Sequence, residues 1–230
     1  MTIDPEALKE ESYPLPGRVT LRGRTVTLEP LNAEVHSTAL WKTFGGRDEL
    51  WPWLADGPFA SEHELRLATE AKQRSADMIF FAIVPTASGC AEGWTCYMRM
   101  EPMHGVVELG NLVFAPSLQR TTAATEAIFL MTSHVFDYLK YRRCEWKCNA
   151  ENLPSRRAAE RFGFAFEGIF RQHMIVKGRS RDTAWFSMLD SEWPVRKRAF
   201  EVWLAPENFA SDGRQRQSLQ QIAAAQTKSR

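Results

Sequence analysis

The residues whose types and spacing could do chemistry follow a strand that the apolar pattern predicts over 106–114. Pro116 ends that strand, and the segment 118–124 (Leu-Gln-Arg-Thr-Thr-Ala-Ala) leads into a long predicted helix. The first amides of a helix have no partners within it, and the helix dipole adds positive charge there. Such a start can bind phosphate, and Arg120 could add a contact. Every strand-to-helix connection has such an end, so the pattern alone is weak evidence.

A second polar segment lies at the start of a helix predicted over 152–162. Asn152 and Ser155 fall together directly after a predicted strand, and Gly163 ends the helix. The ordinary structural explanation is that Asn152 caps the helix and that Pro154 lies in its first turn. That explanation accounts for much of the segment. It leaves open why Asn152 and Ser155 occur together immediately after a strand.

The elements that must position these residues are read from apolar periodicity. Alternating or continuous apolar runs predict strands within 19–31, 78–84, 92–100, 106–114, 143–148, 164–176 and 182–189. Helical spacing predicts helices over 33–43, 61–76, 119–140 and 152–162, and another from residue 193 onward. This order predicts an α/β (α+β) fold in which helices cover both faces of one mixed sheet.

The chain is expected to form one domain with two appendages. Residues 1–18 are polar and interrupted by proline, which predicts an extended arm. Residues 19–193 form the predicted domain. Residues 194–230 are expected to contain a helix followed by a polar tail, mobile from Ser211 onward.

Composition bounds the class of protein. The chain has 230 residues, of which 44% are hydrophobic and 25% are charged, so it can form a core and is not mostly disordered. A net charge of +1 favours neither nucleic acid nor an anionic membrane as a partner. No apolar run approaches the ~18 residues of a membrane span, and the N-terminus lacks an apolar signal core. We expect a soluble, cytoplasmic protein.

The cysteines and histidines are not spaced like a metal site. Cys90, Cys96, Cys144 and Cys148 lack the paired Cys-x-x-Cys spacing of zinc sites, and the five histidines are scattered. Buried free thiols are the favoured interpretation, with a metal site or a disulfide as the alternative. No metal is expected.

Taken in order, the motifs resemble the GNAT superfamily of acyl-CoA-dependent N-acetyltransferases, over residues 18–194. Gln119-Arg-Thr-Thr-Ala-Ala124, after its strand, resembles the pyrophosphate loop of that family, usually Gln/Arg-x-x-Gly-x-Gly/Ala. Asn152-x-x-Ser155, followed by 161–164 (Arg-Phe-Gly-Phe), resembles its pantetheine-binding helix. The fold that this resemblance implies is a mostly antiparallel central sheet with helices on both faces.

Two further segments point to one branch of that superfamily. Phe166-Glu-Gly168 and the Trp- and Pro-rich segment 51–59 are similar to the ribosomal-protein-serine acetyltransferase-like (RimL-like) group. The chain departs from the family pattern at Thr122, where the pyrophosphate loop usually has glycine. It departs again at Ala159, where many members have a tyrosine acid.

The resemblance implies acetyl-CoA as cosubstrate and a direct attack by an amine within a ternary complex. It assigns the general base to Glu167, with a solvated strand carboxylate as the alternative, and Glu108 is a second candidate. Ser155 would protonate the leaving thiolate. The cofactor-binding residues that it implies are Leu112, Val113, Phe114, Gln119, Arg120, Thr121, Thr122, Ala123, Ala124, Asn152 and Ser155.

The expected activity is transfer of an acetyl group to a primary amine of a small molecule or peptide. The alternative is a catalytically weak module that binds or senses acyl-CoA. Residues 142–181 contain ten basic residues and four acidic ones, which suits an anionic cofactor; a solvated basic face or an acidic partner would explain the excess equally well. Nucleic-acid binding is disfavoured because the chain lacks high overall charge. No membrane partner is expected, and a homodimer is possible.

The sequence does not reveal the acceptor. Its wall is expected from residues 32–60 and 169–185, where Trp51, Phe59 and Phe170 could contribute to an aromatic cleft with Trp53 and Trp185. For Trp53 and Trp185 a place in the core is the favoured interpretation.

Overall fold

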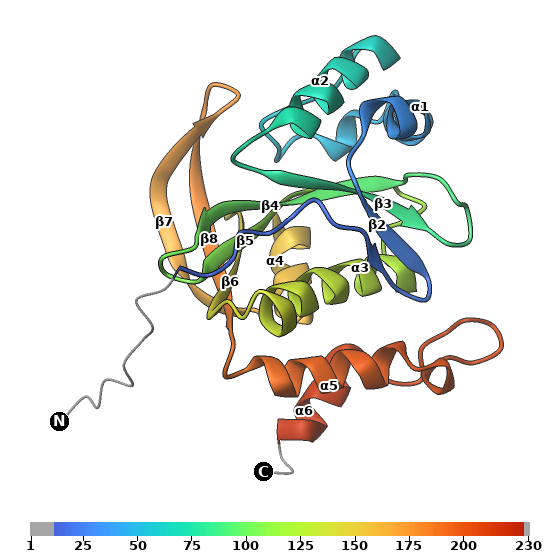
Figure 1. Cartoon of the computed structure of the whole chain (residues 1–230), viewed down its shortest axis with the longest axis vertical. Helices are drawn as coiled ribbons and strands as arrows, with labels where there is room; N and C mark the ends of the chain where they lie inside the picture. The colour runs from blue at the N-terminus through green and yellow to red at the C-terminus, as the bar shows by residue number, and fades with distance from the viewer. Residues whose placement is uncertain (1–11, 228–230) are drawn as a thin grey trace.

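A computed structural model describes residues 12–227, and it contains one central sheet covered by helices on both faces (Figure 1). The strand order is β1-β2-β3-β4-β5-β6-β8-β7, and β5 and β6 are parallel while the other neighbours are antiparallel. The predicted α/β (α+β) class, with a mostly antiparallel sheet, is confirmed. The strands are β1 (Leu21–Arg22), β2 (Val26–Pro30), β3 (Ile79–Pro85), β4 (Gly93–Glu101), β5 (Val106–Phe114), β6 (Arg143–Asn149), β7 (Ala165–Val176) and β8 (Arg179–Leu189).

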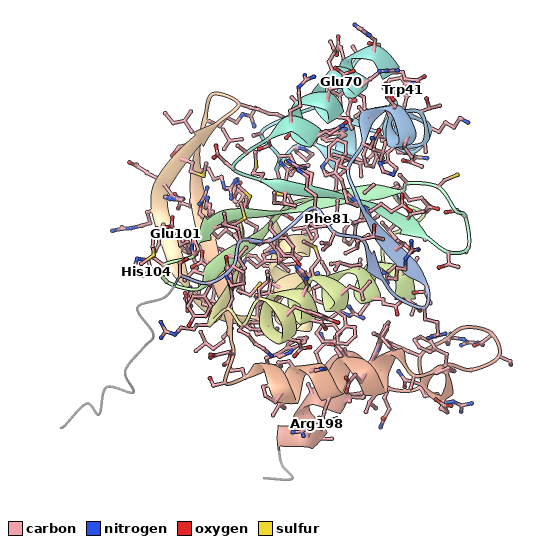
Figure 2. All side chains as sticks on the ribbon, in the orientation of Figure 1. Trp41, Glu70, Phe81, Glu101, His104 and Arg198 are labelled. Carbon is pink, nitrogen blue, oxygen red and sulfur yellow. The ribbon has the colours of Figure 1, made fainter. Side chains whose placement is uncertain are left out.

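The sheet separates the core into two layers, each covered by helices. In Figure 1, α1 (Ala33–Phe44) and α2 (Glu62–Arg74) lie on one face of the sheet, and α3 (Thr122–Ser133) and α4 (Leu153–Arg161) lie on the other. Helices α5 (Trp193–Leu204) and α6 (Leu219–Thr227) form a further layer beyond α3. Figure 2 shows Phe81 of β3 at the centre of the molecule, where it is fully buried. Both faces of the sheet are therefore packed.

The first predicted strand is divided into β1 and β2 by a turn fastened to α3. The buried carboxylate of Glu126 accepts hydrogen bonds from the amide of Arg24 (2.9 Å) and the amide of Thr25 (2.6 Å). A Cβ at Gly23 would lie 2.6 Å from Cδ of Glu126. A side chain at this position would therefore displace the carboxylate of Glu126 from the hydrogen bonds that fasten the turn to α3.

The long helix predicted over 119–140 is shorter in the structure. Helix α3 begins at Thr122, because Thr121 caps it by accepting the amide of Ala124 (3.1 Å). It ends at Ser133 and continues as one π-helical turn over His134–Tyr138. Short 3₁₀ turns occur at Asp48–Leu50 and Pro206–Asn208. Apolar spacing located the helix, but its local hydrogen bonds decided where it starts and changes type.

The segment from Ser211, for which the sequence predicts a mobile polar tail, contains a packed helix, α6, within the described residues. Leu219 and Ile222 are 2% and 4% exposed, and both belong to the core cluster shared with α5. The side-chain amide of Asn208 donates to the carbonyls of Trp203 and Gln217, both at 3.1 Å, which holds the connecting loop. These two apolar residues, one turn apart, pack the final helix against α5, while Gln220, Gln221, Ala224 and Ala225 stay exposed.

Both chain ends extend beyond the described residues. Residues 1–11 of the predicted arm and residues 228–230 lie outside them. The inner end of the arm is placed: the amide of Tyr13 donates to the carbonyl of Pro102 (3.0 Å), and its ring packs edge-on against Tyr141. Within residues 12–227, no helix is long and apolar enough to cross a membrane.

The four cysteines differ in exposure. Cys96, Cys144 and Cys148 are buried, as the sequence predicts, but Cys90 is exposed because it lies in the loop between β3 and β4. Burial raises the pKa of Cys148, and the pKa values of Cys96 and Cys144 rise further for the same reason. These three thiols are therefore packing groups rather than nucleophiles.

Candidate active site

The sheet opens between its two parallel strands. The register of β5 and β6 ends at the pair Leu109–Trp146, although β5 continues to Phe114 and β6 continues to Asn149. Beyond that pair, β5 stays with β4 and β6 stays with β8. Backbone polar groups on the facing edges are therefore free to bind something other than a neighbouring strand.

A bulge in β5 marks the start of this opening. Asn111 has φ 50°, in the left-handed region that asparagine tolerates better than most residues. Its Oδ1 accepts a hydrogen bond from Nε1 of Trp94 (3.3 Å) across the neighbouring strand. The strand bends at this point, which separates its end from β6.

A cavity of about 230 Å³ occupies the opening between β5 and β6. The segment after α1, the diverging strands, the start of α4 and the β7–β8 hairpin all contribute to it. The lining residues are Leu50, Trp53, Leu54, Ala55, Met98, Arg99, Glu108, Asn111, Leu112, Trp146, Lys147, Cys148, Asn149, Asn152, Ser155, Met174, Arg181 and Thr183.

Glu108 is the carboxylate that lines this cavity. Its side chain is 5% exposed, and its Oε2 lies 3.2 Å from Nζ of Lys147 and 3.5 Å from Nε of Arg99. Burial raises the pKa of Glu108, while Lys147 and Arg99 act in the opposite direction and offset only part of the rise. A carboxyl group with a raised pKa is a better proton acceptor than an ordinary one.

Lys147 is shared between two carboxylates. Its Nζ lies 2.6 Å from Oε2 of Glu145, in addition to its contact with Glu108, and 3.6 Å from the ring centre of Trp185. The ammonium is almost completely buried. Its position is therefore set by three groups and does not depend on solvent.

The start of α4 brings two sequence-predicted residues to the cavity. Oδ1 of Asn152 accepts from the amide of Ser155 (3.1 Å), so the capping role is confirmed, and Asn152 also lines the cavity. Oγ of Ser155 accepts a hydrogen bond from Nε1 of Trp146 (3.0 Å). Because that oxygen is the acceptor, the bond from Trp146 does not use the hydroxyl hydrogen of Ser155. A hydrogen bond with Ser155 also offsets part of the rise that burial causes in the pKa of Cys148.

The predicted base Glu167 lies elsewhere. Its carboxylate forms a two-pronged ion pair with the guanidinium of Arg143 (2.7 and 2.5 Å) and accepts from Oγ of Ser187 (2.6 Å). The hydrogen bonds from Arg143 lower the pKa of Glu167. Glu167 is not among the residues that line the cavity. The structure thus brings Ser155 and Glu108 together with the opening, but not Glu167.

In the predicted phosphate loop, the side chain of Gln119 is engaged, Arg120 is exposed, and two backbone amides have no acceptor among the described residues. Nε2 of Gln119 donates to the carbonyl of Phe114 (2.8 Å), and Arg120 is exposed in a left-handed conformation with φ 64°. Among residues 12–227, none accepts a hydrogen bond from the amide of Thr122 or Ala123. These amides begin α3, where they could meet an anion.

This loop and the cavity are separate features. Thr121, Thr122 and Ala123 border a hollow of about 500 Å³ on the side of the β1–β2 turn, which Arg24 also borders. Of the remaining predicted residues, Leu112 lines the cavity, whereas Val113 is buried in the opposite core layer. Successive side chains of β5 point to opposite faces of the sheet, which explains why Leu112 and Val113 lie on different sides.

Several cavity residues were missed or misplaced by sequence reasoning. Trp53 was expected in the core but lines the cavity, and Trp185 is half-buried against Phe170, with ring centres 4.5 Å apart. Arg99 has φ 46° at a register shift in β4. Strand pairing creates that bulge, so no signal within the strand itself identifies Arg99.

The β7–β8 hairpin closes one side of the cavity. It rises beside the sheet toward the layer that contains α2 (Figure 1). At its tip, Nζ of Lys177 donates to the carbonyls of Trp51 (2.9 Å) and Asp56 (3.1 Å) in the segment before α2. Two segments far apart in sequence are thereby joined across the cavity.

Comparison with known proteins places this chain among acetyltransferases. A model of the acetyltransferase (GNAT) domain matches residues 25–165. The chain is 50% identical to a GCN5-related N-acetyltransferase from Brucella melitensis, with a TM-score of 0.91 over 93% of this chain and 97% of that structure.

More distant relatives share the fold. YdaF of Bacillus subtilis (strain 168), which its name provisionally assigns to the ribosomal N-acetyltransferases, is 22% identical over 64% of this chain and 80% of its own length. RimJ of Mycobacterium smegmatis, solved in complex with CoA-disulfide, is 22% identical with a TM-score of 0.62, over 74% of this chain and 84% of that structure.

Proposed function

This chain belongs to the GNAT acetyltransferase family and is an N-acetyltransferase, and on that premise we propose that a primary amine attacks acetyl-CoA directly in a ternary complex. The observation that carries this proposal is the cavity at the opening between β5 and β6. A buried carboxylate, Glu108, and an oriented hydroxyl, Ser155, both line it. A small molecule or a peptide end is the proposed acceptor.

Glu108 is the proposed proton acceptor. An alkylammonium with a pKa near ~10 must lose a proton before its nitrogen can attack. Glu108 lies in the cavity and has a raised pKa, whereas Glu167 has a lowered pKa and its oxygens are engaged by Arg143 and Ser187. The geometry therefore favours Glu108, the second candidate from the sequence, over Glu167.

Ser155 is the proposed proton donor. The amine nitrogen forms a bond to the thioester carbon, and the carbon–sulfur bond then breaks to release a thiolate. The hydroxyl of Ser155 gives its proton to that sulfur and recovers one from solvent. The hydrogen bond from Trp146 supports this role because it holds Oγ in place without using the hydroxyl hydrogen.

The cosubstrate is proposed to lie along the diverging strands. Its pantetheine arm would use free backbone groups of β5 near Leu112 and the side chain of Asn152. Its pyrophosphate would meet the free amides of Thr122 and Ala123 at the start of α3. Thr122, where the family usually has glycine, would place its side chain beside that phosphate.

Thiol release from acetyl-CoA in the presence of a panel of primary amines tests this function. We expect Glu108→Gln to lower kcat by about 10²–10⁴-fold while calorimetry shows unchanged binding of acetyl-CoA. Glu167→Gln is the matched control and should retain activity.

The second candidate, a module that only binds acyl-CoA, makes a different prediction. It requires micromolar acetyl-CoA binding with turnover that neither Glu108→Gln nor Ser155→Ala changes. If Glu167→Gln instead removes activity while Glu108→Gln does not, the base is Glu167 and the assignment above is wrong.

A further inference from the structure

Arg181 is a cation in the cavity without an ion-pair partner. Its side chain lines the cavity from β8, and its Nε is buried without a hydrogen-bond partner. Among residues 12–227, no carboxylate forms an ion pair with it, whereas Arg99 and Lys147 both pair with Glu108. Leaving a buried charged donor unsatisfied is costly, and such a group is expected to meet a ligand.

The carboxylates close to Arg181 in sequence or space are already engaged. Oδ1 of Asp182 accepts the backbone amide of Gln172 (2.7 Å), which places that neighbouring carboxylate in the hairpin. Glu108, whose negative charge acts on Arg181, is itself paired with Lys147 (3.2 Å) and Arg99 (3.5 Å). Within residues 12–227, neither of these carboxylates forms an ion pair with the guanidinium.

The cavity as a whole has excess positive charge. Three cations line it, Arg99, Lys147 and Arg181, against the one carboxylate of Glu108. The same excess of positive charge acts on His173, which packs nearby on the hairpin. Burial is the largest cause of its lowered pKa, and these three cations lower the pKa further. Acetyl-CoA does not supply the missing anion here, because its pantetheine arm is neutral and the predicted phosphate loop borders a separate hollow.

We propose that the acceptor is a small amino carboxylate, whose carboxylate binds Arg181 while its amine faces Glu108. This inference rests on the proposed function and names the class of its acceptor. A guanidinium binds a carboxylate through two parallel hydrogen bonds, which would also orient the amine.

The size of the cavity favours a small acceptor. Its volume is about 230 Å³, below the range of about 300–1,000 Å³ that is usual for ligand pockets, and the pantetheine arm would occupy the part near Leu112 and Asn152. The contact of Lys177 with Trp51 and Asp56 closes one side, so a folded protein surface would have to displace the hairpin to enter.

The test compares each amino carboxylate with the amide of equal shape. Glycine, β-alanine and γ-aminobutyrate are paired with glycinamide, β-alaninamide and γ-aminobutyramide, and kcat/KM is measured from thiol release with acetyl-CoA. At least one acid should be preferred over its amide by about tenfold or more, the range of a charge-assisted hydrogen bond.

Variants of Arg181 test whether this residue causes the preference for the acid over its amide. Arg181→Gln should remove the preference for the acid over its amide, and Arg181→Lys should keep part of it, since the charge remains but the planar fork is lost. Arg179→Gln is the matched control, because Arg179 is exposed on the same strand outside the cavity and should change nothing. Acetyl-CoA affinity should be equal in all four proteins.

A binding measurement separates this inference from the proposed activity. With CoA in place of acetyl-CoA no acetyl group is present, and calorimetry reads binding of the same acids and amides. Binding of an acid that Arg181→Gln weakens, without thiol release from any amine, would contradict the transferase reaction but support the ligand class. Thiol release or binding with no preference for acids, or a preference that Arg181→Gln retains, would overturn the inference.

Discussion

The ammonium of Lys147 and the carboxylate of Glu108 form a buried ion pair, with Nζ 3.2 Å from Oε2 and both side chains 5% exposed. The pair lies where β5 and β6 separate: Glu108 is opposite Glu145 in the register, and Lys147 follows Glu145 by two residues on β6, just beyond the last pair, Leu109–Trp146. The pKa of Glu108 nevertheless stays raised, because desolvation outweighs the attraction of Lys147 and Arg99. Glu108 can therefore exchange a proton closer to neutral pH than an exposed glutamate can.

That raised pKa predicts how activity depends on pH. The deprotonated form of Glu108 is the proposed base, so kcat/KM should fall as pH decreases, with a midpoint above the ordinary glutamate value of about 4.3. A pH profile of thiol release measures this midpoint. Lys147→Met removes the cation that holds it down and should move the midpoint upward, provided that the variant folds by circular dichroism. An unchanged midpoint would contradict the role of Glu108.

The same group makes a prediction about stability. The folded protein holds the proton of Glu108 more tightly than the unfolded chain does, so its contribution favours folding at low pH. That contribution declines as pH rises from the ordinary value to the raised one. Urea unfolding across this interval should show a smaller decline for Glu108→Gln. Equal pH slopes in the two proteins would argue against a raised pKa.

The ion pair of Glu167 predicts the opposite pH dependence of folding stability. Arg143 lowers the pKa of Glu167, so the stabilisation is present above the ordinary value and is lost as pH falls through the lowered one. Because Glu167 is 40% exposed, solvent screening limits the effect of Glu167→Gln to about 1 kcal/mol in unfolding free energy. Urea unfolding at neutral pH measures it, and kcat should stay within about twofold of wild type.

The hydrogen bond from Trp146 to Ser155 can be tested separately from the hydroxyl itself. Ser155→Ala removes the proposed acid and should lower kcat by about 10²-fold or more. Trp146→Phe keeps an aromatic ring but removes the N–H donor, so kcat should fall less, by about tenfold, while KM for acetyl-CoA is little changed. Steady-state kinetics on both variants shows which substitution lowers kcat more. If Trp146→Phe costs more than Ser155→Ala, the hydroxyl is not the acid.

The contact at the hairpin tip should affect the acceptor more than the cosubstrate. Lys177→Met removes the two hydrogen bonds to Trp51 and Asp56 that close the cavity. We expect KM for the acceptor to rise severalfold, about the effect of one or two lost hydrogen bonds, with unchanged acetyl-CoA affinity. Kinetics and calorimetry measure the two effects, and Arg179→Gln serves as the control on the same hairpin.

The packing of α6 predicts a loss of stability without a loss of binding. Leu219 is 2% exposed, so Leu219→Ala should lower the unfolding free energy by about 2–4 kcal/mol. Gln220→Ala, at an exposed position of the same helix, should be nearly neutral. Urea unfolding measures both changes. Acetyl-CoA binding should be unaffected, because α6 lies beyond α3 (Figure 1) and none of its described residues lines the cavity. A neutral Leu219→Ala would mean that the helix does not contribute to the core.

Much of the fold and part of the site could be predicted from local sequence. Alternating apolar residues located the main strands, and Asn152 located the start of α4, because these signals act within a few residues. Ser155 and Leu112 were also identified, through a motif whose order follows the chain. Helix α6 was not predicted, because its two buried apolar residues, Leu219 and Ile222, are a weak signal in the sequence. They become core residues only because α5 provides a surface against which they pack.

The sequence by itself determined the order of the main strands, the family resemblance and the starts of α1, α2 and α4, because each depends on neighbouring residues along the chain. Only the tertiary structure decided which carboxylate faces the cavity. Glu108 and Glu167 are both strand glutamates, but strand pairing places one beside Lys147 at the opening and the other against Arg143. The unpaired state of Arg181 was decided in the same way, since ion pairing depends on distances between strands that no local pattern encodes.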